Sequence, residues 1–567
     1  MSLRLTGAVL SVALVVSGSA ASGSTAGART DAPSGTGART SSAAPGPSSI
    51  KHMPYRPTPA IEAIPATPDP AAIPKPNPLG NYNAYDLNAY QVIHFPRRQP
   101  GDPEANSEPG GSPEHGTCPP ATCDNHEREF VRYWRNLMKP LMKPFGGSVH
   151  TYQFRSPGSS AFQAAGDTQN LMATIPGAVY PERSVIVSGH YDMTDSGPAS
   201  AWDSSEGHAT VFRIAKIMTD YWKKTGTRPK VSVKFTAWGA EEAGTYGSQA
   251  YIRDNLLNFP GLKVNGYFNL DPCAGAYPAY YRGNGVDRTP MVMQLGDPDN
   301  QLTPAKKKAF ASFNTQARKI VGDVMNHLDD KLNDVPQAPE IFVSKEEAAA
   351  AGVPEQEKEI VTALGGLAAF SSDYANFEAI GIPILNLFPD YFGPHADGEP
   401  GRQDGLAILH TKNDNLKTLN GLTGVDQTGL TPSEGWYKGL EFCAHMHGWF
   451  MLQSNMGGAV ARNKAPVAYF EPLRPKSTRN AGTQDPLVAG TPITFDAHGS
   501  YAFSRPRTLR KVPTRKLRFK WSFGDGTRGK GIKVRHAYKR PGAYVATLTV
   551  TRPGGKRDRM KVLIDVR

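Results

Sequence analysis

Residues 231–251 read VSVKFTAWGAEEAGTYGSQAY, an apolar run followed by the adjacent carboxylates Glu241 and Glu242 and a glycine-rich turn. The β-branched and aromatic residues of the run predict a strand that is covered on both faces of its sheet. The glycines that follow predict a sharp turn. Ligands of open α/β sheets bind outside the carboxyl ends of the strands, which is where the glutamate pair falls. Taken alone, the pair is also consistent with two solvated loop residues.

The length and the first residues of the chain indicate an exported protein with more than one domain. At about 150 residues per domain, 567 residues are too many for one core. Residues 1–28 contain Arg4, then an apolar stretch, then small residues, which is the pattern of a secretory signal peptide. The apolar stretch is shorter than the ~18 residues that a membrane span requires. We therefore expect a secreted, extracellular protein with no membrane span in its mature form.

Three regions follow the signal peptide. Residues 29–123 are rich in Pro, Ala, Ser and Gly, which predicts a leader or propeptide. Residues 124–455 alternate helical and strand patterns, so we expect an α/β domain with a mixed, mostly parallel sheet and helices on both faces. Within this domain, residues 290–367 contain charged stretches with a helical pattern, which predict a largely helical insertion over the sheet. Residues 466–567 show strand alternation and turn residues, which predicts a small all-β sandwich.

Charge is distributed unevenly along the chain. Residues 466–567 hold 23 Lys and Arg against 6 Asp and Glu, a balance of +17, and because the whole chain carries +12, residues 1–465 carry −5. The basic surface therefore belongs to the predicted sandwich. The sandwich lacks the basic and aromatic pattern of a nucleic-acid-binding module. We expect it to bind a polymeric or anionic surface and no nucleic acid; a soluble spacer is the alternative.

The four cysteines suit an oxidising compartment without forming a dense disulfide scaffold. Cys118 and Cys123 are close enough in sequence to close a small loop. Cys273 and Cys443 are far apart, and they either pair or remain buried thiols. Neither pattern resembles a zinc knuckle.

Metal-ligating residue types occur at the ends of predicted strands and in the loops after them. In chain order they are His190, Asp203, Glu242, Asp271 and His410. Their separations of 13, 39, 29 and 139 residues are too irregular for a local zinc finger and suit a site assembled across one sheet. Three carboxylates and one hydroxide would balance two zinc ions, for which imidazole and carboxylate are suitable ligands. We expect two Zn²⁺ per chain, bridged most naturally by Asp203 at the ~3.5 to 4 Å spacing of two-metal sites.

Two further carboxylates are candidates for catalytic roles. Glu241 lies beside a ligand but is needed for no metal bond, so it can act as the general base and acid. Asp192 can accept the second imidazole N–H of His190 and fix its tautomer, and Asp414 could do the same for His410.

Six motifs carry a specific resemblance. In chain order they are GHYDM, WDSSEG, AWGAEEAGTYGS, NLDP, SSDYANFEAIGIP and LHTKND. Together they resemble the successive blocks of the secreted, co-catalytic zinc aminopeptidases of bacteria, the leucine-aminopeptidase-like exopeptidases, over residues 124–452. The resemblance implies that His190 and Asp271 bind one zinc ion, Glu242 and His410 bind the other, Asp203 bridges them, and Glu241 is the base.

One departure from that family concerns the oxyanion. Some secreted members have a Tyr immediately before the last histidine, where this chain has Leu409. Tyr374 and Tyr391 are therefore the candidates for stabilising the oxyanion.

The C-terminal region resembles a PKD domain, the polycystic-kidney-disease repeat. The blocks APVAYF, TPITFDAHGS, WSFGDGT and GAYVATLTVT carry this resemblance. It implies a module that binds polymeric substrates or surfaces.

We therefore expect a secreted exopeptidase that hydrolyses N-terminal residues from peptides through a metal-bridging hydroxide, with Glu241 as general base. A carboxypeptidase or dipeptidase on the same scaffold is the nearest alternative, and Arg282 and Arg402 keep it open as anchors for a substrate carboxylate. A catalytically dead scaffold that acts as a binding protein is the alternative of a different class.

Overall fold

The structure is a computed structural model of the chain, which divides into the units 1–53 and 54–567. The described residues are 77, 80, 82–100, 126–159, 163–194, 200–273, 291–332, 361–364, 372–389, 409–411, 414–423, 434–453, 459–460, 466–474, 485–505 and 508–567. All of them belong to the second unit. The predicted signal peptide and the cysteine pair Cys118 and Cys123 lie outside the described residues.

An eight-stranded sheet organises the first part of this unit, in the order β1-β2-β5-β3-β6-β9-β7-β8. Four of its seven neighbouring pairs are parallel, namely β5 with β3, β3 with β6, β6 with β9 and β7 with β8. This confirms the mixed, mostly parallel sheet. The strands are β1 (Ser148–Ser156), β2 (Gly166–Ile175), β3 (Tyr180–His190), β5 (Val231–Trp238), β6 (Lys263–Asn269), β7 (Met291–Leu295), β8 (Val361–Leu364) and β9 (Ile384–Pro389). A separate short pair joins β4 (Arg228–Pro229) to β10 (Ala459–Val460).

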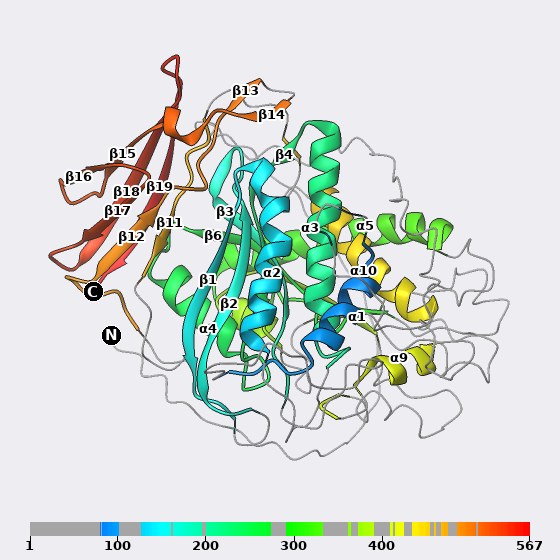
Figure 1. Ribbon diagram of the computed structural model, residues 1–567. Helices are drawn as coiled ribbons and strands as arrows, with labels where there is room; N and C mark the ends of the chain where they lie inside the picture. Colours follow the sequence, from blue (N-terminus) through cyan, green and yellow to red (C-terminus); the bar gives the residue numbers. More distant parts are fainter. Residues whose placement is uncertain are drawn as a thin grey trace, which may run out of the picture. The chain divides into compact units, whose positions relative to one another are not determined.

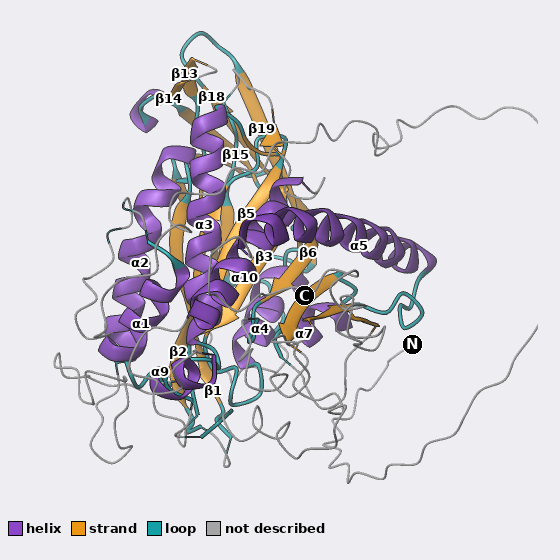
Figure 2. Cartoon of the chain, turned by 90° about the vertical axis from the view of Figure 1, so that its right-hand side faces the viewer, coloured by secondary structure: helices purple, strands orange, loops and turns teal. Residues whose placement is uncertain are grey.

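Helices cover both faces of the sheet, as predicted (Figures 1 and 2). Successive residues of a strand point to opposite faces, so Val185 and Val187 pack into one core and Ile186 into the other. The first face carries α1 (Ala84–His94), α2 (Glu127–Met142), α3 (Ser205–Thr225), α5 (Pro304–Leu332) and α10 (Glu434–Gln453). The second carries α4 (Tyr246–Tyr251), the π-helix η4 (Ile252–Leu257) and α7 (Tyr374–Ala379). Among the described helices, none is long and apolar enough to cross a membrane.

The segment 290–367 differs from its prediction as a helical insertion over the sheet. It supplies β7 and β8 to the edge of the sheet itself. Its helix α5 packs Phe313 and Ile320 into the main core. The two strands have five and four residues, and periodicity alone does not distinguish so short an apolar run from a segment of a buried helix.

Helix α1 lies within the region that the sequence assigns to the leader, yet it is part of the core. Nine of its 11 residues are buried. Its first N–H, that of Ala84, donates to Glu441 Oε1 of α10 at 2.6 Å. The same carboxylate binds Arg213 of α3 at 2.9 Å and His445 at 3.2 Å. Glu441 therefore joins α1, α3 and α10 through one fully buried carboxylate.

The C-terminal part is a β-sandwich, in agreement with the prediction. One sheet has the order β11-β12-β17 and the other β16-β15-β18-β19. Ala546, Leu548 and Val550 of β18 are buried, as the alternation of their strand predicts. The strands are β11 (Glu471–Leu473), β12 (Pro492–Asp496), β15 (Arg518–Ser522), β16 (Arg528–Lys530), β17 (Lys533–Ala537), β18 (Gly542–Thr551) and β19 (Arg557–Val566), with a hairpin of β13 (Phe503–Arg505) and β14 (Thr508–Lys511).

The sandwich and the eight-stranded sheet are joined by buried contacts. Phe259, which follows η4, is fully buried and belongs to the core cluster of the sandwich. The backbone N–H of Gly261 donates to the carbonyl of Leu563 in β19 at 3.1 Å. Glu471 of β11 lies with its Oε1 3.7 Å from Lys234 Nζ of β5, and both side chains are buried.

We predict that Glu441→Gln destabilises the fold by about 3 kcal/mol, since removing one charge of a buried ion pair leaves the other uncompensated. The free energy of unfolding in urea measures this effect. Asp299→Asn is the matched control, because the Asp299 side chain is 93% exposed. Equal stabilities of the two variants would show that Glu441 does not hold α1, α3 and α10 together.

Candidate metal centre

The five predicted ligands lie together at the carboxyl edge of the sheet. His190 ends β3, Asp203 precedes α3, Glu242 follows β5, Asp271 follows β6 and His410 lies in the loop 409–411. Their ligand atoms form two groups of three, His190 with Asp203 and Asp271, and Asp203 with Glu242 and His410. Within each group all ligand atoms lie within 4.8 Å of one another. Asp203 is shared by the two groups.

The two oxygens of Asp203 face different imidazoles. His190 Nε2 lies 3.0 Å from Asp203 Oδ1 and 3.0 Å from Asp271 Oδ1. His410 Nε2 lies 3.0 Å from Asp203 Oδ2 and 3.0 Å from Glu242 Oε2. Asp203 thus lies between two groups, each of which contains an imidazole and a second carboxylate.

Glu242 provides a direct test of whether a cation fits. Its Oε1 is buried and has no hydrogen-bond donor in the described part of the chain. Burial and the neighbouring Asp203 carboxylate together raise the pKa of Glu242 to about 8. A divalent cation would supply the missing partner and favour the ionised form of the ligand. Two imidazoles and three carboxylates are a donor set that suits zinc, so the residues present fit the predicted metal.

Glu241 lies outside both groups of ligands. Its Oε2 is 4.0 Å from His190 Nε2, and its side chain is 11% exposed. Burial raises the pKa of Glu241 well above its usual value, and the carboxylates of Asp271 and Glu242 raise it as well. A carboxyl group with high proton affinity beside the ligands is suited to accept and release a proton.

Asp192 positions both the glutamate pair and the imidazole of His190. Its carboxylate accepts the backbone N–H of Glu241 at 3.0 Å and that of Glu242 at 3.2 Å. Gln163 Nε2 donates to the same carboxylate at 3.0 Å. The Nδ1 of His190 lies 3.2 Å from the backbone carbonyl of Asp192 and 3.6 Å from its carboxylate. Asp192 therefore orients the imidazole mainly through its backbone and the glutamates through its side chain.

Asp414 supports the predicted ligand Asp203, whereas the sequence-based prediction paired it with His410. Its carboxylate accepts the backbone N–H of Trp202 at 2.7 Å and of Asp203 at 3.0 Å. It thus fixes the loop of the shared ligand Asp203, and no hydrogen bond joins it to His410 among the described contacts. The prediction paired Asp414 with His410 because the two are close in sequence, whereas the fold brings Asp414 to the loop before α3.

The loops of the centre depend on close backbone approach and on strained residues. Ala240 and His410 have φ of 56° and 59°, in the left-handed region that is rare for residues with a side chain. A Cβ on Gly207 would lie 2.2 Å from the carbonyl oxygen of Leu270, so only glycine fits there. Such strain is often found at functional sites, where the surrounding structure maintains it.

Two supporting residues were not singled out from the sequence. The Ser372 hydroxyl donates to Asp271 Oδ2 and in turn accepts from Asn269 Nδ2 at 3.1 Å. Arg98 is fully buried and donates from Nε to the carbonyl of Tyr191 at 2.6 Å and from Nη2 to Ser205 Oγ at 2.6 Å. Ser372 lies in the quoted motif SSDYANF, which could have indicated it. Arg98 lies in the predicted leader and has no local signal.

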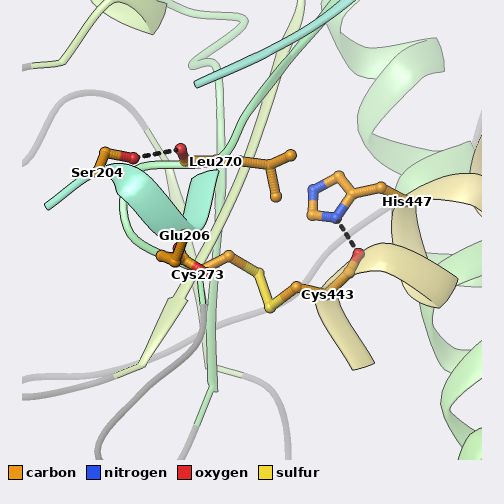
Figure 3. The surroundings of a disulfide bond; sticks show 6 residues. All are labelled: Ser204, Glu206, Leu270, Cys273, Cys443 and His447. Carbon is orange, nitrogen blue, oxygen red and sulfur yellow. Dashed lines mark hydrogen bonds between the residues drawn. A yellow bond between two sulfur atoms is a disulfide. The ribbon is translucent and has the colours of Figure 1, made fainter. Parts of the chain in front are cut away.

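Cys273 and Cys443 form a disulfide, which decides between the two alternatives left open by the sequence (Figure 3). Cys273 lies two residues after the ligand Asp271, and Cys443 lies in α10. The backbone N–H of Cys273 donates to the Glu206 carboxylate in the first turn of α3. The loop that carries Asp271 is therefore fixed to two helices of the same face.

Of the two oxyanion candidates, Tyr374 is described. It is buried, its hydroxyl accepts from Gln294 Nε2 at 3.0 Å, and burial raises its pKa to about 12. Tyr391, Arg282 and Arg402 lie outside the described residues.

We predict that Asp192→Asn weakens zinc binding by about 10- to 100-fold, which is the usual effect of losing a group that orients metal ligands. The amide would present N–H groups to backbone N–H donors that now meet a carboxylate. Competition with a chromogenic chelator measures the affinity. Asp220→Asn on α3 is the control; a similar loss in both variants would remove Asp192 from the support of the centre.

Comparisons with known proteins give matches to both parts of the chain. The sequence profile of Peptidase family M28 matches residues 170–427, and that of the PKD domain matches residues 474–564. Aminopeptidase NAALADL1 of Rattus norvegicus is 35% identical over 105 residues, which cover 18% of this chain and 14% of that protein. Carboxypeptidase Q of Bos taurus is 30% identical over 129 residues, which cover 23% of this chain and 25% of that protein. The chain thus spans a small part of the length of these relatives.

Among solved structures, the LapA aminopeptidase of Legionella pneumophila is 14% identical with a TM-score of 0.36, and the match covers 65% of this chain and 70% of that chain. The sequence profiles identify both parts of the molecule at the domain level. The chain contains a domain of peptidase family M28, followed by a PKD domain.

Proposed function

We propose that the protein is a secreted exopeptidase that removes N-terminal residues from peptides, with two zinc ions held by the five ligands and Glu241 as general base. The observation that carries this proposal is Asp203, whose two oxygens each lie 3.0 Å from a different imidazole. Glu241 remains beside the ligands and outside both groups. The match to peptidase family M28 supports peptide hydrolysis and zinc.

When bound, zinc would polarise the scissile carbonyl and lower the pKa of the attacking water. Glu241 would take the proton of that water and deliver it to the leaving amine. The high pKa of Glu241 that burial causes favours this transient protonation. The hydrogen bond from the Glu241 backbone to Asp192 keeps the base beside the reacting groups.

Charge around the centre favours the ammonium end of a peptide. Beyond the five ligands, the described residues add Glu241 and the buried carboxylates Asp192, Asp373 and Asp414. Arg98 is a cation in this region, but its three guanidinium nitrogens donate to protein oxygens. Two zinc ions would offset four of the seven carboxylate charges at the centre, and the charge that remains would attract a free α-ammonium and repel a free carboxylate.

Two alternatives remain as outcomes of the tests. A carboxypeptidase or dipeptidase would use the same ligands. The similarity to bovine Carboxypeptidase Q supports this alternative. A dead scaffold that only binds would lack a ligand or the base, and all six residues are present here.

We further propose that the signal peptide at 1–28 directs export and that the PKD domain binds a polymeric or anionic surface. Helix α1 is buried in the core. Any removal of the leader is therefore expected to end before residue 82.

We predict that Glu241→Gln lowers kcat by ~100-fold or more, because the amide cannot accept the proton. Zinc content and the free energy of unfolding are expected to be unchanged, since neither ligand group includes Glu241. The variant is assayed with a free tripeptide, alongside Glu182→Gln as control. Wild-type turnover in Glu241→Gln would remove this residue from the mechanism.

We also predict that N-acetylation of a peptide abolishes its hydrolysis, whereas C-amidation leaves it largely intact. Acetylation removes the positive charge of the α-ammonium, through which the negatively charged centre would bind the peptide. Mass spectrometry of the products, with and without a chelator, identifies the residue released. Hydrolysis that survives acetylation and disappears on amidation would identify a carboxypeptidase instead.

A further inference from the structure

One face of the β16-β15-β18-β19 sheet carries a regular array of cations. Strand pairing places Lys530, Lys520, Thr549 and Arg559 in one row across the four strands. The next row contains Arg528, Ser522, Thr547 and Lys561, and the row on the other side contains Arg518, Thr551 and Arg557. All seven cations are exposed. The alternating residues of these strands, including Phe519, Leu548 and Met560, are buried in the sandwich core.

The rows form three parallel lanes. Thr547, Thr549 and Thr551 of β18 make a central lane of short, half-buried hydroxyl side chains. The cations of β19 flank this threonine lane on one side, and those of β15 and β16 flank it on the other. Neighbouring strands are ~4.8 Å apart, so the flanking lanes are roughly 10 Å apart at the backbone. The threonine lane is therefore bordered on both sides by the longer side chains of Lys and Arg.

The three rows contain no Asp or Glu. The nearest acid that shares this side of β19 is Asp565, two rows beyond Lys561, and its Oδ2 lies 3.7 Å from Nε of Arg567. Seven cations without acidic partners in their rows repel one another, and an anion lying among them would relieve this repulsion. Successive cations of β19 are roughly 7 Å apart, because every second residue faces the same side.

We propose that the threonine lane and its flanking cations bind a linear polymer of phosphate groups, lying along β18. Arg and Lys offer only donors, and a phosphate offers only acceptors to them. The threonine hydroxyls can donate to the same oxygens. The proposal rests on the proposed binding role of the PKD domain and is independent of the peptidase activity.

Two other anionic partners fit the face less well. The three rows contain no aromatic side chain on which the bases of a nucleic acid would stack. An anionic membrane would require apolar side chains to enter the interface, and the exposed pair Val545 and Leu563 lies only at one end, next to Lys561. A polymer whose recognition depends on repeated phosphates alone matches the lanes best.

The test measures binding of the full chain to long-chain inorganic polyphosphate by titration calorimetry. The variant Lys520→Glu/Arg559→Glu/Lys561→Glu reverses three cations around the threonine lane. The control Arg535→Glu/Lys539→Glu/Arg540→Glu changes the net charge equally at exposed positions outside the three rows. We expect the first variant to weaken binding by ~30-fold or more and the control by less than ~3-fold, with affinity falling steeply between about 50 and 200 mM salt. Thermal unfolding confirms that both variants fold.

Several results would overturn the proposal: no binding by the wild-type chain at low salt, equal weakening in the two variants, or equal affinity for poly-glutamate. Preferential binding of anionic lipid vesicles, or tighter binding of single-stranded DNA than of polyphosphate, would also overturn it and assign the face to that partner. Peptide hydrolysis by the wild-type chain is measured separately. A failure of polymer binding is thus distinguishable from a failure of the proposed peptidase function.

Discussion

The dominant physical constraint at the carboxyl edge of the sheet is the repulsion among carboxylates gathered in a largely buried place. Burial raises the pKa values of Asp373 and Asp414 to about 7 and that of Glu242 to about 8. Without cations, part of this cluster would hold protons at neutral pH. Two divalent cations would offset most of its negative charge, which gives the five ligands a physical reason to lie together. The cluster consists of Asp192, Asp203, Glu241, Glu242, Asp271, Asp373 and Asp414.

Elements far apart in sequence hold this cluster in place. Asp192 and Asp414 each accept two backbone N–H groups from the loops that carry the ligands. Arg98 joins the loop after β3 to the start of α3. The disulfide of Cys273 fixes the loop of Asp271 to α10. Ala240 has a left-handed backbone conformation, and the hydrogen bond from the next residue, Glu241, to Asp192 helps to maintain it.

Most of the sheet and the gathering of His190, Asp203, Glu242, Asp271 and His410 at its carboxyl edge could be predicted, because long apolar runs such as β5 identify the strands, and these residues follow the strand ends. The short strands β7 and β8 could not be predicted, because a short apolar run fits a strand and a buried helix segment equally well. The role of Asp414 and the contribution of Arg98 depend on hydrogen bonds across 211 and 107 residues, which local patterns do not encode. The pairing of Cys273 with Cys443 could not be predicted for the same reason, because their spacing in the sequence fits both a disulfide and two buried thiols.

Lys234 shows that the sandwich contributes to the packing of the eight-stranded sheet. It lies in β5, the strand that leads to the glutamate pair, and is only 7% exposed. Burial opposes its charged form, but Tyr251 and Glu471 raise its pKa above the usual value. Glu471 belongs to the first strand of the sandwich, and its Oε2 also lies 3.3 Å from His150 of β1. Without the sandwich, a central strand of the peptidase sheet would contain a buried ammonium without its carboxylate, a costly arrangement. The sandwich therefore contributes to the stability of the eight-stranded sheet through Glu471.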